Sequence, residues 1–402
     1  MTTRSIKAAL AGGVALLAMQ AVTAHATHEL LHRQKAPQFG ISAEMRMKVQ
    51  DSYIVTFVDS MPAAEVEAYA KAMARDYKGK ILHVYDTAIK GFAIKLPRAR
   101  AMRMANDPMV MRMEDDAVAF VDTHELLHKV HNQAKGGFGV LSHTSGSQTT
   151  PWGITRVGGS MDGSGLNTYA WVIDTGIDLD HPDLNVNTAW SRSFVSGLSS
   201  PDDGNGHGTH VAGIIAAKNN SFGVVGVAAG ATLVAVRVLN SQGSGTYSDI
   251  IAGVNYVGQG SIPGDVANMS LGGPANSSLD NAIINVANMG VFFSLAAGNE
   301  SQFAGNVSPA RTNHSRVYTV SAIDSNDNFA SFSNWGNPPV DCAAPGVSIF
   351  STYRGGSYRT LSGTSMAAPH VAGILLINNG TAFAGGTAKN DPDGNPDPIC
   401  VK

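Results

Sequence analysis

The sequence predicts an α/β protein, with a mostly parallel sheet covered by helices on both faces and a small α+β unit before it. Three observations predict this class. Beyond residue 150, apolar stretches of strand length alternate with helical stretches, as in parallel sheets with crossover helices. Residues 52–120 predict the element order βαββαβ, the split βαβ arrangement. Polar residues beside glycines follow predicted strands, where α/β sheets bind their ligands.

The small unit alternates short strands with two helices. Period-2 patterns and β-branched residues favour strands, and helix formers at helical spacing favour helices. We expect strands at 53–58, 80–86, 91–96 and 110–121, and helices at 62–77 and 99–107.

The larger unit repeats a strand–helix pattern. Strands are predicted at 169–174, 232–239, 266–271 and 291–298, and helices at 210–218, 248–260 and 277–290. Residues 27–50 show no periodic pattern, and the Gly/Ser-rich residues 123–147 predict an exposed linker. Residues 381–402, rich in Gly, Pro and Asp, predict a polar tail with little capacity to form a core.

Composition excludes several classes of protein. The net charge of −3 argues against nucleic acid as a partner, because phosphate binding needs a basic excess. Two cysteines, Cys342 and Cys400, are too few for a disulfide scaffold. They could form one disulfide, or Cys342 could be a buried thiol in its apolar surroundings.

The N-terminus resembles a secretory signal. Two positive charges in MTTRSIK precede a short apolar run, and small residues precede a predicted cut after Ala26. A membrane anchor is the alternative, but the run is short for a span. We therefore predict a signal peptide at 1–26, secretion to the extracellular space or periplasm, and no membrane association after cleavage.

The segment THELLH occurs twice, at 27–32 and 123–128. Each copy has the H-E-x-x-H spacing of zinc peptidases, so zinc catalysis is one hypothesis. Catalytic zinc needs a third protein ligand, and neither copy is followed by a recognisable one. The alternative interpretation is that the two copies mark the boundaries of the small unit.

A second constellation predicts nucleophilic catalysis. Asp174 ends a predicted strand, and His207 and Ser365 each follow a glycine turn at a predicted helix start. A serine hydroxyl needs an imidazole to accept its proton, and a carboxylate to orient that imidazole. A helix N-terminus also favours a developing oxyanion. Each residue alone could be a turn or cap residue, but the three in order are improbable by chance.

Five segments, VIDTGIDLDHPDL, GNGHGTHVAGIIAAKNNSFGVVGVA, ANMSLGGP, LAAGNES and LSGTSMAAPHVAG, resemble the motifs of the subtilisin-like serine proteases. The resemblance implies that Asp174 is the triad carboxylate, His207 the general base and Ser365 the nucleophile. It also implies that Asn299 donates to the oxyanion. Residues 51–122 resemble the ferredoxin-like inhibitory prodomain of that family. The resemblance therefore implies a zymogen with a processing site in 123–147 and a peptidase domain at 148–380.

The resemblance also implies a substrate-binding surface with small, apolar walls and no acid. From these walls we predict a preference for large apolar or aromatic residues before the scissile bond. The predicted wall residues are Ser270, Leu271, Gly272, Gly273, Ala296, Ala297 and Gly298.

A structural calcium ion is predicted after the His207 helix, because KNNSFGV resembles a calcium loop of the family. Side-chain and backbone oxygens are the hard donors that Ca²⁺ prefers; a solvated loop without metal is the alternative. A second acidic segment, DPDGNPD at 391–397, is a weaker candidate than a plain polar tail. The predicted ligands are Gln148, Asp183, Lys218, Asn220, Phe222 and Val224.

Three functional hypotheses follow. The first is a secreted serine endopeptidase, a monomer that acts on proteins and peptides and is inhibited by its own prodomain. The second is a zinc peptidase built on HELLH. The third is an inactive secreted protein, against which the complete set of catalytic residue types speaks.

Overall fold

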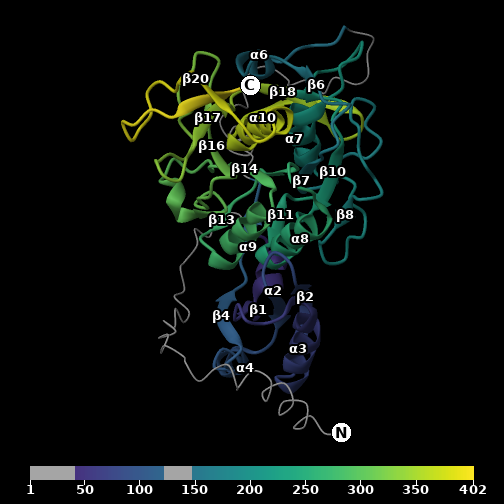
Figure 1. The fold of residues 1–402 in the computed structure, drawn as a ribbon, viewed down its shortest axis with the longest axis vertical. Helices are drawn as coiled ribbons and strands as arrows, with labels where there is room; N and C mark the ends of the chain where they lie inside the picture. The colour runs from purple at the N-terminus through teal and green to yellow at the C-terminus, as the bar shows by residue number, and fades with distance from the viewer. Residues whose placement is uncertain (1–40, 122–146) are drawn as a thin grey trace. The chain divides into compact units, whose positions relative to one another are not determined.

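A nine-stranded sheet forms the centre of the larger unit in the computed structural model, which describes residues 41–121 and 147–402 (Figure 1). Neighbouring strands are parallel except for the edge pair β20–β21. The predicted mostly parallel sheet is therefore confirmed. In spatial order the strands are β20 (Phe383–Thr387), β21 (Pro398–Val401), β17 (Cys342–Pro345), β16 (Val317–Ile323), β14 (Phe292–Ala296), β12 (Val266–Met269), β7 (Ala170–Asp174), β10 (Leu233–Arg237) and β8 (Arg192–Ser193).

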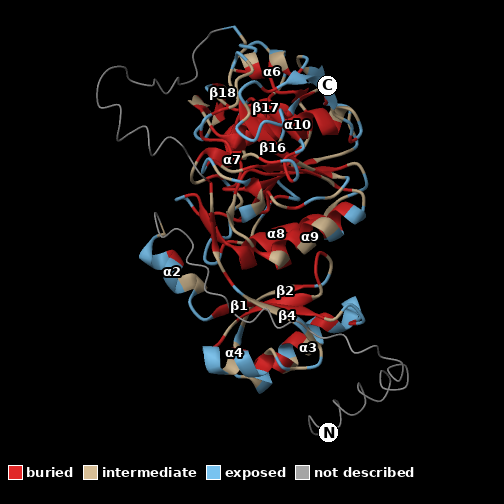
Figure 2. Cartoon of the chain, turned by 90° about the vertical axis from the view of Figure 1, so that its left-hand side faces the viewer, coloured by how far each residue is buried: buried red, intermediate tan, exposed pale blue. Residues whose placement is uncertain are grey.

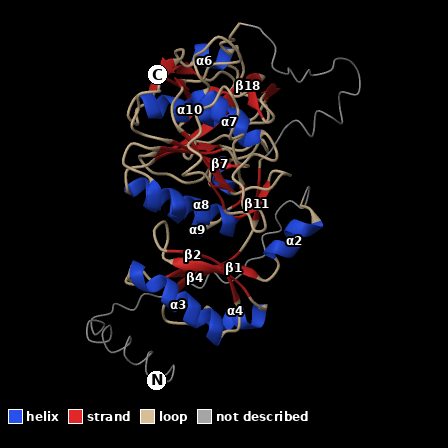
Figure 3. Cartoon of the chain, turned by 90° about the vertical axis from the view of Figure 1, so that its right-hand side faces the viewer, coloured by secondary structure: helices blue, strands red, loops and turns tan. Residues whose placement is uncertain are grey.

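Helices cover both faces of this sheet, with α7 (His207–Ala216) and α10 (Thr364–Ile377) on one side and α8 (Tyr247–Gly260) and α9 (Ser277–Asn288) on the other (Figure 3). Strand β7 shows why both faces must be covered. Its residues Ala170 and Val172 pack into the core beneath α7 and α10, whereas Trp171 and Ile173 pack into the core beneath α8 and α9. Side chains alternate along a strand, so an apolar run buries both faces.

The helices differ in how far they are buried and in how their N-termini are capped. Helices α7 and α10 are buried almost all round (Figure 2), as expected of interior helices with few polar residues. Helix α8 begins after Thr246, whose side chain accepts a hydrogen bond from Asp249 N. Helix α9 begins after Asn276, whose side chain accepts from Leu279 N at 2.9 Å. Such N-caps satisfy amides that have no partner within the helix.

Shorter elements connect the main ones. They are α6 (Trp152–Arg156), β6 (Met161–Asp162), β9 (Ala228–Ala229), β11 (Ser244–Thr246), β13 (Gly273–Pro274), a 3₁₀ turn (Ala304–Asn306), β15 (Val307–Ser308), β18 (Ile349–Tyr353) and β19 (Ser357–Leu361).

The small unit is a four-stranded antiparallel sheet in the order β2-β3-β1-β4. Helices α3 and α4 follow β1 and β3, so the predicted βαββαβ order is confirmed. The bounds are β1 (Ser52–Phe57), α3 (Ala63–Asp76), β2 (Lys80–Tyr85), β3 (Gly91–Lys95), α4 (Arg98–Met104) and β4 (Val110–Asp115).

The single strand predicted at 110–121 is wrong, because the chain divides at Asp116. Beyond β4, a separate strand β5 (Val118–Phe120) leaves the small sheet and pairs with β11 of the larger unit. The buried carboxylate of Asp116 accepts hydrogen bonds from Ser52 in the small unit and Ser248 in the larger one. The division of the strand at Asp116 therefore depends on Ser248, which is 132 residues away in the sequence.

Residues 27–50 also contain a helix that the sequence analysis did not predict, α2 (Ala43–Val49). Ser42 caps it by accepting from Met45 N at 3.2 Å. Met45 is its one buried side chain, so there is no apolar repeat from which a helix could be predicted.

The predicted polar tail at 381–402 is also wrong. Strands β20 and β21 form a hairpin that extends the central sheet beyond β17. A disulfide joins Cys342 in β17 to Cys400 in β21, and Ile399 is fully buried. The alternative of a buried Cys342 thiol is thereby excluded.

Several predictions concern residues outside the described ranges. The signal peptide at 1–26 and both THELLH copies fall within 1–40 or 122–146, and so does all but the last residue of the linker at 123–147, in which the processing site is predicted. Within 41–121 and 147–402, none of the helices has the length and apolar character needed to cross a bilayer.

Candidate active site

The four predicted catalytic residues lie at element ends on the carboxyl edge of the central sheet. Asp174 is the last residue of β7, and Asn299 follows β14 by three residues. His207 is the first residue of α7, and Ser365 is the second residue of α10. This edge is where open α/β sheets bind ligands.

The imidazole of His207 is bound by the carboxylate of Asp174. Its Nδ1 lies 2.9 Å from Asp174 Oδ1 and 3.0 Å from Oδ2. The two side chains are 2% and 0% exposed, so water does not compete for this bond. The other ring nitrogen, Nε2, is buried without a hydrogen-bond partner among the described residues. The ring therefore presents a free nitrogen while its carboxylate partner selects the tautomer that leaves Nε2 unprotonated.

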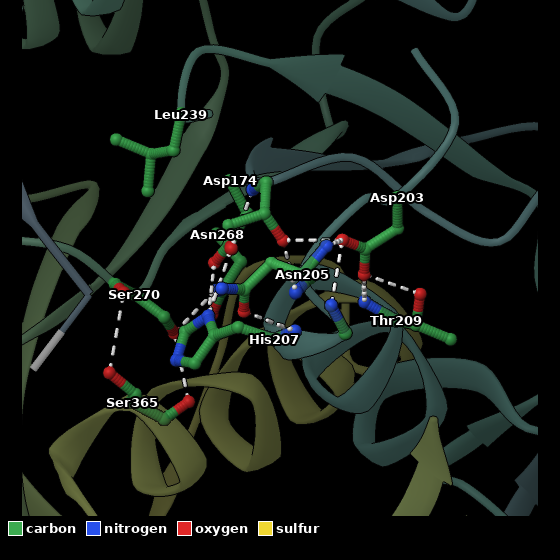
Figure 4. Close-up of polar contacts among 12 residues, drawn as sticks. Asp174, Asp203, Asn205, His207, Thr209, Leu239, Asn268, Ser270 and Ser365 are labelled. Carbon is green, nitrogen blue, oxygen red and sulfur yellow. Dashed lines mark hydrogen bonds and ion pairs between the residues drawn. The ribbon is translucent and has the colours of Figure 1, made fainter. Parts of the chain in front are cut away.

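Figure 4 shows the ring of His207 between Asp174 and the side chain of Ser365. The Ser365 hydroxyl donates to Ser270 O at 3.2 Å, and Ser270 Oγ donates back to Ser365 O at 2.9 Å. The hydroxyl is thus held beside the ring and is not bonded to it. Loose serine–histidine geometry of this kind is common without substrate.

The neighbouring histidine of the same helix has a different environment. His210 Nε2 lies 3.1 Å from Ile349 O and 3.0 Å from Arg359 O. Complete burial lowers the pKa of His210 to about 3. This histidine is neutral and is committed to backbone carbonyls, which leaves His207 as the histidine available for proton transfer.

Asn299 is anchored at the start of α10. Its Oδ1 accepts from Thr364 N at 2.8 Å and from Thr364 Oγ1 at 3.0 Å. Gly363, just before the helix, has φ 155° and ψ 162°, a region essentially restricted to glycine. A Cβ on Gly363 would lie 3.5 Å from Asn299 Nδ2. The amide donor of Asn299 and the first amides of α10 are therefore grouped beside Ser365.

Asp203, four residues before His207, is not among the residues predicted from the sequence. Its carboxylate accepts five hydrogen bonds around the start of α7. The signal in the sequence is weak, because an aspartate in PDDGNGHG is also typical of a solvated turn.

The predicted substrate-binding residues lie on two neighbouring chain segments. Ser270–Gly273 follows β12, and Ala296–Gly298 ends and follows β14, the parallel neighbour of β12. These segments contain no acidic residue, and the nearby Glu300 is bound to Asn334. A Cβ on Gly298 would lie 2.7 Å from Glu300 Oε2, which itself accepts from Asn334 Nδ2 at 2.6 Å.

The C-terminal strand of the small unit pairs with this surface. Phe120 N donates to Gly272 O at 2.9 Å, and Gly272 N donates to Phe120 O at 3.0 Å. On its other side, β5 pairs antiparallel with β11, a segment that the sequence analysis did not identify. An extended strand of the chain itself is therefore held between two segments beside Ser365, in the manner of β-augmentation.

Carboxylates of the small unit also contact helix starts of the larger unit; both units belong to the compact part spanning Lys35–Lys402. Glu114 Oε1 accepts from Ser277 N at 3.1 Å, Glu114 Oε2 accepts from Ser278 N at 2.9 Å, and the Ser278 hydroxyl also donates to Glu114. Asp116 accepts from Ser248 N at 3.0 Å and from Ser248 Oγ at 2.6 Å. These hydrogen bonds hold the small unit on α8 and α9, and the charge of Glu114 is also favourable at the N-terminus of α9.

The structure brings all six predicted calcium ligands together. The amide Nε2 of Gln148 lies 2.7 Å from Lys218 O, 3.3 Å from Asn220 Oδ1, 3.4 Å from Phe222 O and 3.1 Å from Val224 O. An amide nitrogen carries two hydrogens, so the oxygens around this position outnumber the donors.

The carboxylate of the sixth residue, Asp183, is hydrogen-bonded to two residues of this group. Its Oδ1 accepts from Asn220 Nδ2 at 2.7 Å, and its Oδ2 accepts from Val224 N at 3.0 Å. The second acidic segment is the loop of the β20–β21 hairpin, where Asp397 accepts from Ser321 Oγ at 2.5 Å. In the described part of the chain, no three His, Cys, Asp or Glu side chains are grouped as metal ligands.

The fold and the placement of these residues define the class of protein: a serine peptidase precursor whose strand β5 pairs with the segments beside the predicted nucleophile. Two family models match the chain: the subtilase family over residues 167–381 and peptidase inhibitor I9 over residues 52–122. The chain belongs to the subtilase family and is a subtilisin-like serine protease with an inhibitor-type prodomain. The resemblance stated from the sequence is confirmed.

Individual relatives agree with this assignment. The chain is 41% identical over 333 residues to the subtilisin-like serine protease AsES of Sarocladium strictum, covering 81% of this chain and 79% of the relative. It is 38% identical over 348 residues to a cuticle-degrading protease of Metarhizium anisopliae, covering 85% and 82%. The crystal structure of a cold adapted subtilisin-like serine proteinase matches with a TM-score of 0.55 and 38% identity, covering 62% of this chain and 97% of that one.

Proposed function

We propose that the protein is a secreted serine endopeptidase that hydrolyses peptide bonds through an acyl-enzyme and is made as a self-processing zymogen. The observation that carries this proposal is the buried Asp174–His207 pair, whose free Nε2 lies beside Ser365. The prodomain match supports the zymogen.

The proposed mechanism assigns one role to each residue. Ser365 Oγ attacks the peptide carbonyl while His207 Nε2 accepts its proton, and Asp174 stabilises the imidazolium. The Asn299 amide and the Ser365 backbone N–H stabilise the oxyanion. The imidazolium then protonates the leaving amine, and water, deprotonated by His207, hydrolyses the ester at Ser365.

The proposed specificity follows from the wall segments. Strand pairing with Gly272 and with β11 binds the substrate backbone independently of its side chains, which favours broad specificity. The small wall residues Ala296, Ala297 and Gly298 favour a large apolar or aromatic residue before the scissile bond. A substrate panel that showed a strict requirement for Arg or Lys would contradict this preference.

The test of the function is Ser365→Ala in the full chain, with Ser362→Ala as the matched control. Ser362 lies three residues upstream, and its hydroxyl accepts from Ser348 N at 2.9 Å. We expect Ser365→Ala to remain an uncleaved precursor without casein hydrolysis, and Ser362→Ala to mature and digest casein. Maturation and casein digestion by Ser365→Ala would show that the serine assignment is wrong.

Inhibitors separate this function from zinc catalysis. We expect an organophosphate to label Ser365 and abolish activity, and a zinc-selective chelator to leave activity unchanged. Loss of activity with the zinc chelator alone would support the HELLH hypothesis instead.

We also propose a structural Ca²⁺ at the Gln148 loop. The surplus of oxygens supports it, because rotation of the Gln148 amide by 180° would exchange its donor for a fifth acceptor. Lys218, Phe222 and Val224 would supply carbonyl oxygens, and Asn220 and Gln148 side-chain oxygens. The carboxylate of Asp183 would supply a further side-chain oxygen and negative charge, and the ion would tie the start of the peptidase domain to the segment after α7.

The calcium proposal is tested on Ser365→Ala, which avoids autolysis. Saturation at about 100 times the dissociation constant stabilises by about 2.7 kcal/mol, which corresponds to a rise in melting temperature of roughly 5–11 °C. We expect CaCl₂ to raise the melting temperature in this range, Asn220→Ala to abolish the rise, and the control Asn219→Ala, at an exposed neighbouring position, to retain it. No rise in the Ser365→Ala parent would refute the site.

A further inference from the structure

The carboxylate of Asp203 lies between the end of β7 and the first turn of α7 (Figure 4). We propose that Asp203 is a positioning residue for catalysis, which holds the backbone around His207 so that its ring remains aligned with Asp174 and Ser365. This inference rests on the proposed function, because it concerns the same reaction.

Asp203 is 6% exposed, and its carboxylate accepts five hydrogen bonds. Oδ1 accepts from Thr175 Oγ1 at 2.9 Å, Asn205 N at 2.8 Å and Gly206 N at 2.8 Å. Oδ2 accepts from Thr209 N at 3.0 Å and Thr209 Oγ1 at 2.6 Å. An amide in place of this carboxylate would turn its NH₂ group toward one of the two sets of donors, so the site favours a carboxylate.

These donors surround the catalytic pair in sequence and in space. Asn205 and Gly206 precede His207, and Thr209 follows it by two residues. On the other side, Thr175 is the residue after Asp174, and its N–H donates to Asp174 Oδ1 at 2.7 Å. One carboxylate thus joins the strand end that carries the triad aspartate to the helix start that carries the histidine.

The hydroxyl of Thr175 extends this connection. It donates to Asp203 and accepts from Gly208 N at 3.0 Å. Gly208 follows His207 directly, so the residues on both sides of the histidine are bound to Asp203 directly or through this one hydroxyl. The helix start cannot shift relative to β7 without breaking several of these bonds.

A buried cation supports the negative charge of Asp203. Arg237, 5% exposed, pairs with Asp174 in the register of β10 and β7. Its guanidinium donates to Asp202 O at 2.6 Å and to Ser200 O at 3.2 Å, which fixes the chain leading to Asp203. Burial lowers the pKa of Arg237, and the charges of Asp203 and Asp202 oppose that shift. Arg237 therefore belongs to the scaffold that holds the chain next to Asp203.

The kinetic test compares Asp203→Asn with the matched control Asp202→Asn. The Asp202 side chain is exposed and accepts one hydrogen bond, from Leu179 N at 3.3 Å. In Asp203→Asn the amide NH₂ must face N–H donors, so the start of α7 shifts. We expect kcat to fall about 100-fold, the cost of a misplacement of roughly 1 Å. KM should change less than about 3-fold, because β11 and Gly272 bind the substrate backbone elsewhere.

A second pair of variants is milder, in case Asp203→Asn does not mature. Thr175→Val removes the bridging hydroxyl at nearly constant volume, and Thr175→Ser retains it. We expect an intermediate loss of kcat, about 10-fold, in the valine variant and rescue by serine. A purely structural role would lower the activity of the valine and serine variants only in proportion to the loss of folded protein.

A spectroscopic test needs no activity. In the uncleaved Ser365→Ala precursor, we expect the Nδ1 proton between His207 and Asp174 to give a far-downfield NMR resonance, because the bond is short and buried. We expect Asp203→Asn to shift or broaden this resonance, and Asp202→Asn to leave it unchanged. An unchanged resonance together with a kcat equal to that of Asp202→Asn would overturn the positioning role.

The outcomes separate this inference from the proposed function. If Ser365→Ala retains activity, the proposed function fails whatever Asp203 does. If Ser365→Ala is inactive and Asp203→Asn behaves like Asp202→Asn in both assays, the function stands and the positioning role fails.

Discussion

The disulfide between Cys342 and Cys400 should contribute a large part of the stability of the peptidase domain. It joins β17 to the C-terminal hairpin across a sequence separation of 58 residues. Without it, β21 is attached to the central sheet by its pairing with β17 and by the burial of Ile399. We predict that Cys342→Ala/Cys400→Ala folds into the same sheet with a much lower free energy of unfolding.

The magnitude follows from the loop that the disulfide closes. For a loop of this length, the lost chain entropy of the unfolded state is worth about 4 kcal/mol at 25 °C. For a domain of this size, about 4 kcal/mol corresponds to a decrease in melting temperature of roughly 8–16 °C. Both sulfurs are nearly inaccessible, at 2% and 5% residue exposure, so a reductant should act only after the hairpin opens.

The assay is thermal unfolding of Ser365→Ala with and without the two cysteine substitutions, so that autolysis does not interfere. We expect the double alanine variant to melt lower in the stated range, and a reductant to lower the melting temperature of the parent but not of the variant. A melting temperature within 2 °C of the parent would refute the reasoning, because the non-covalent contacts of the hairpin would then suffice.

Three further predictions concern the active site and the prodomain. Asn299→Ala should lower kcat about 10²- to 10³-fold, as loss of such a donor does in a subtilisin, with little change in KM; an equal change in both constants would indicate a substrate-binding role. Burial raises the pKa of Asp116 to about 6, so its stabilising effect is complete below pH 3.8 and is lost as the pH rises through 6. In urea unfolding of Ser365→Ala, ionisation of Asp116 between pH 4 and 7 should lower the free energy of unfolding by at most ~3 kcal/mol. Asp116→Asn should remove this part of the pH dependence. If the free energy of unfolding depends on pH equally with and without Asp116→Asn, the assignment is contradicted. Glu114→Gln removes the negative charge that faces the first amides of α9. Release of the cleaved prodomain should then be roughly 10- to 100-fold faster, and the lag before activity should be shorter. The control Glu65→Gln, at an exposed position, should match the wild type.

Local sequence signals were sufficient for the type of sheet and for the placement of the predicted catalytic residues at element ends. Strand and helix periods, and glycines at their junctions, depend on neighbours within a few residues. In a parallel sheet all strand ends of one kind share an edge, so Asp174, His207 and Ser365 could be assigned to one site before any contact was known. The split βαβ unit was predictable for the same reason.

The errors occurred where a distant partner decides the local structure. The polar residues 381–402 form strands because β17 and Cys342 supply their pairing partners. The strand predicted at 110–121 divides because Asp116 is bound by Ser248. Helix α2 has too short a buried face to show a period.

In the site too, some features could be predicted from short sequence motifs and others depend on contacts in the folded chain. The sequence by itself determined the family, the sheet type and the residue types that serine chemistry requires, because each is written in short, contiguous motifs. Only the tertiary structure decided that Asp203 binds five donors, that β11 supplies a second edge for the extended strand, and that oxygens from residues 218–224 converge on Gln148. Hydrogen bonds act over about 3 Å, and only the folded chain brings residues so far apart in sequence within that distance.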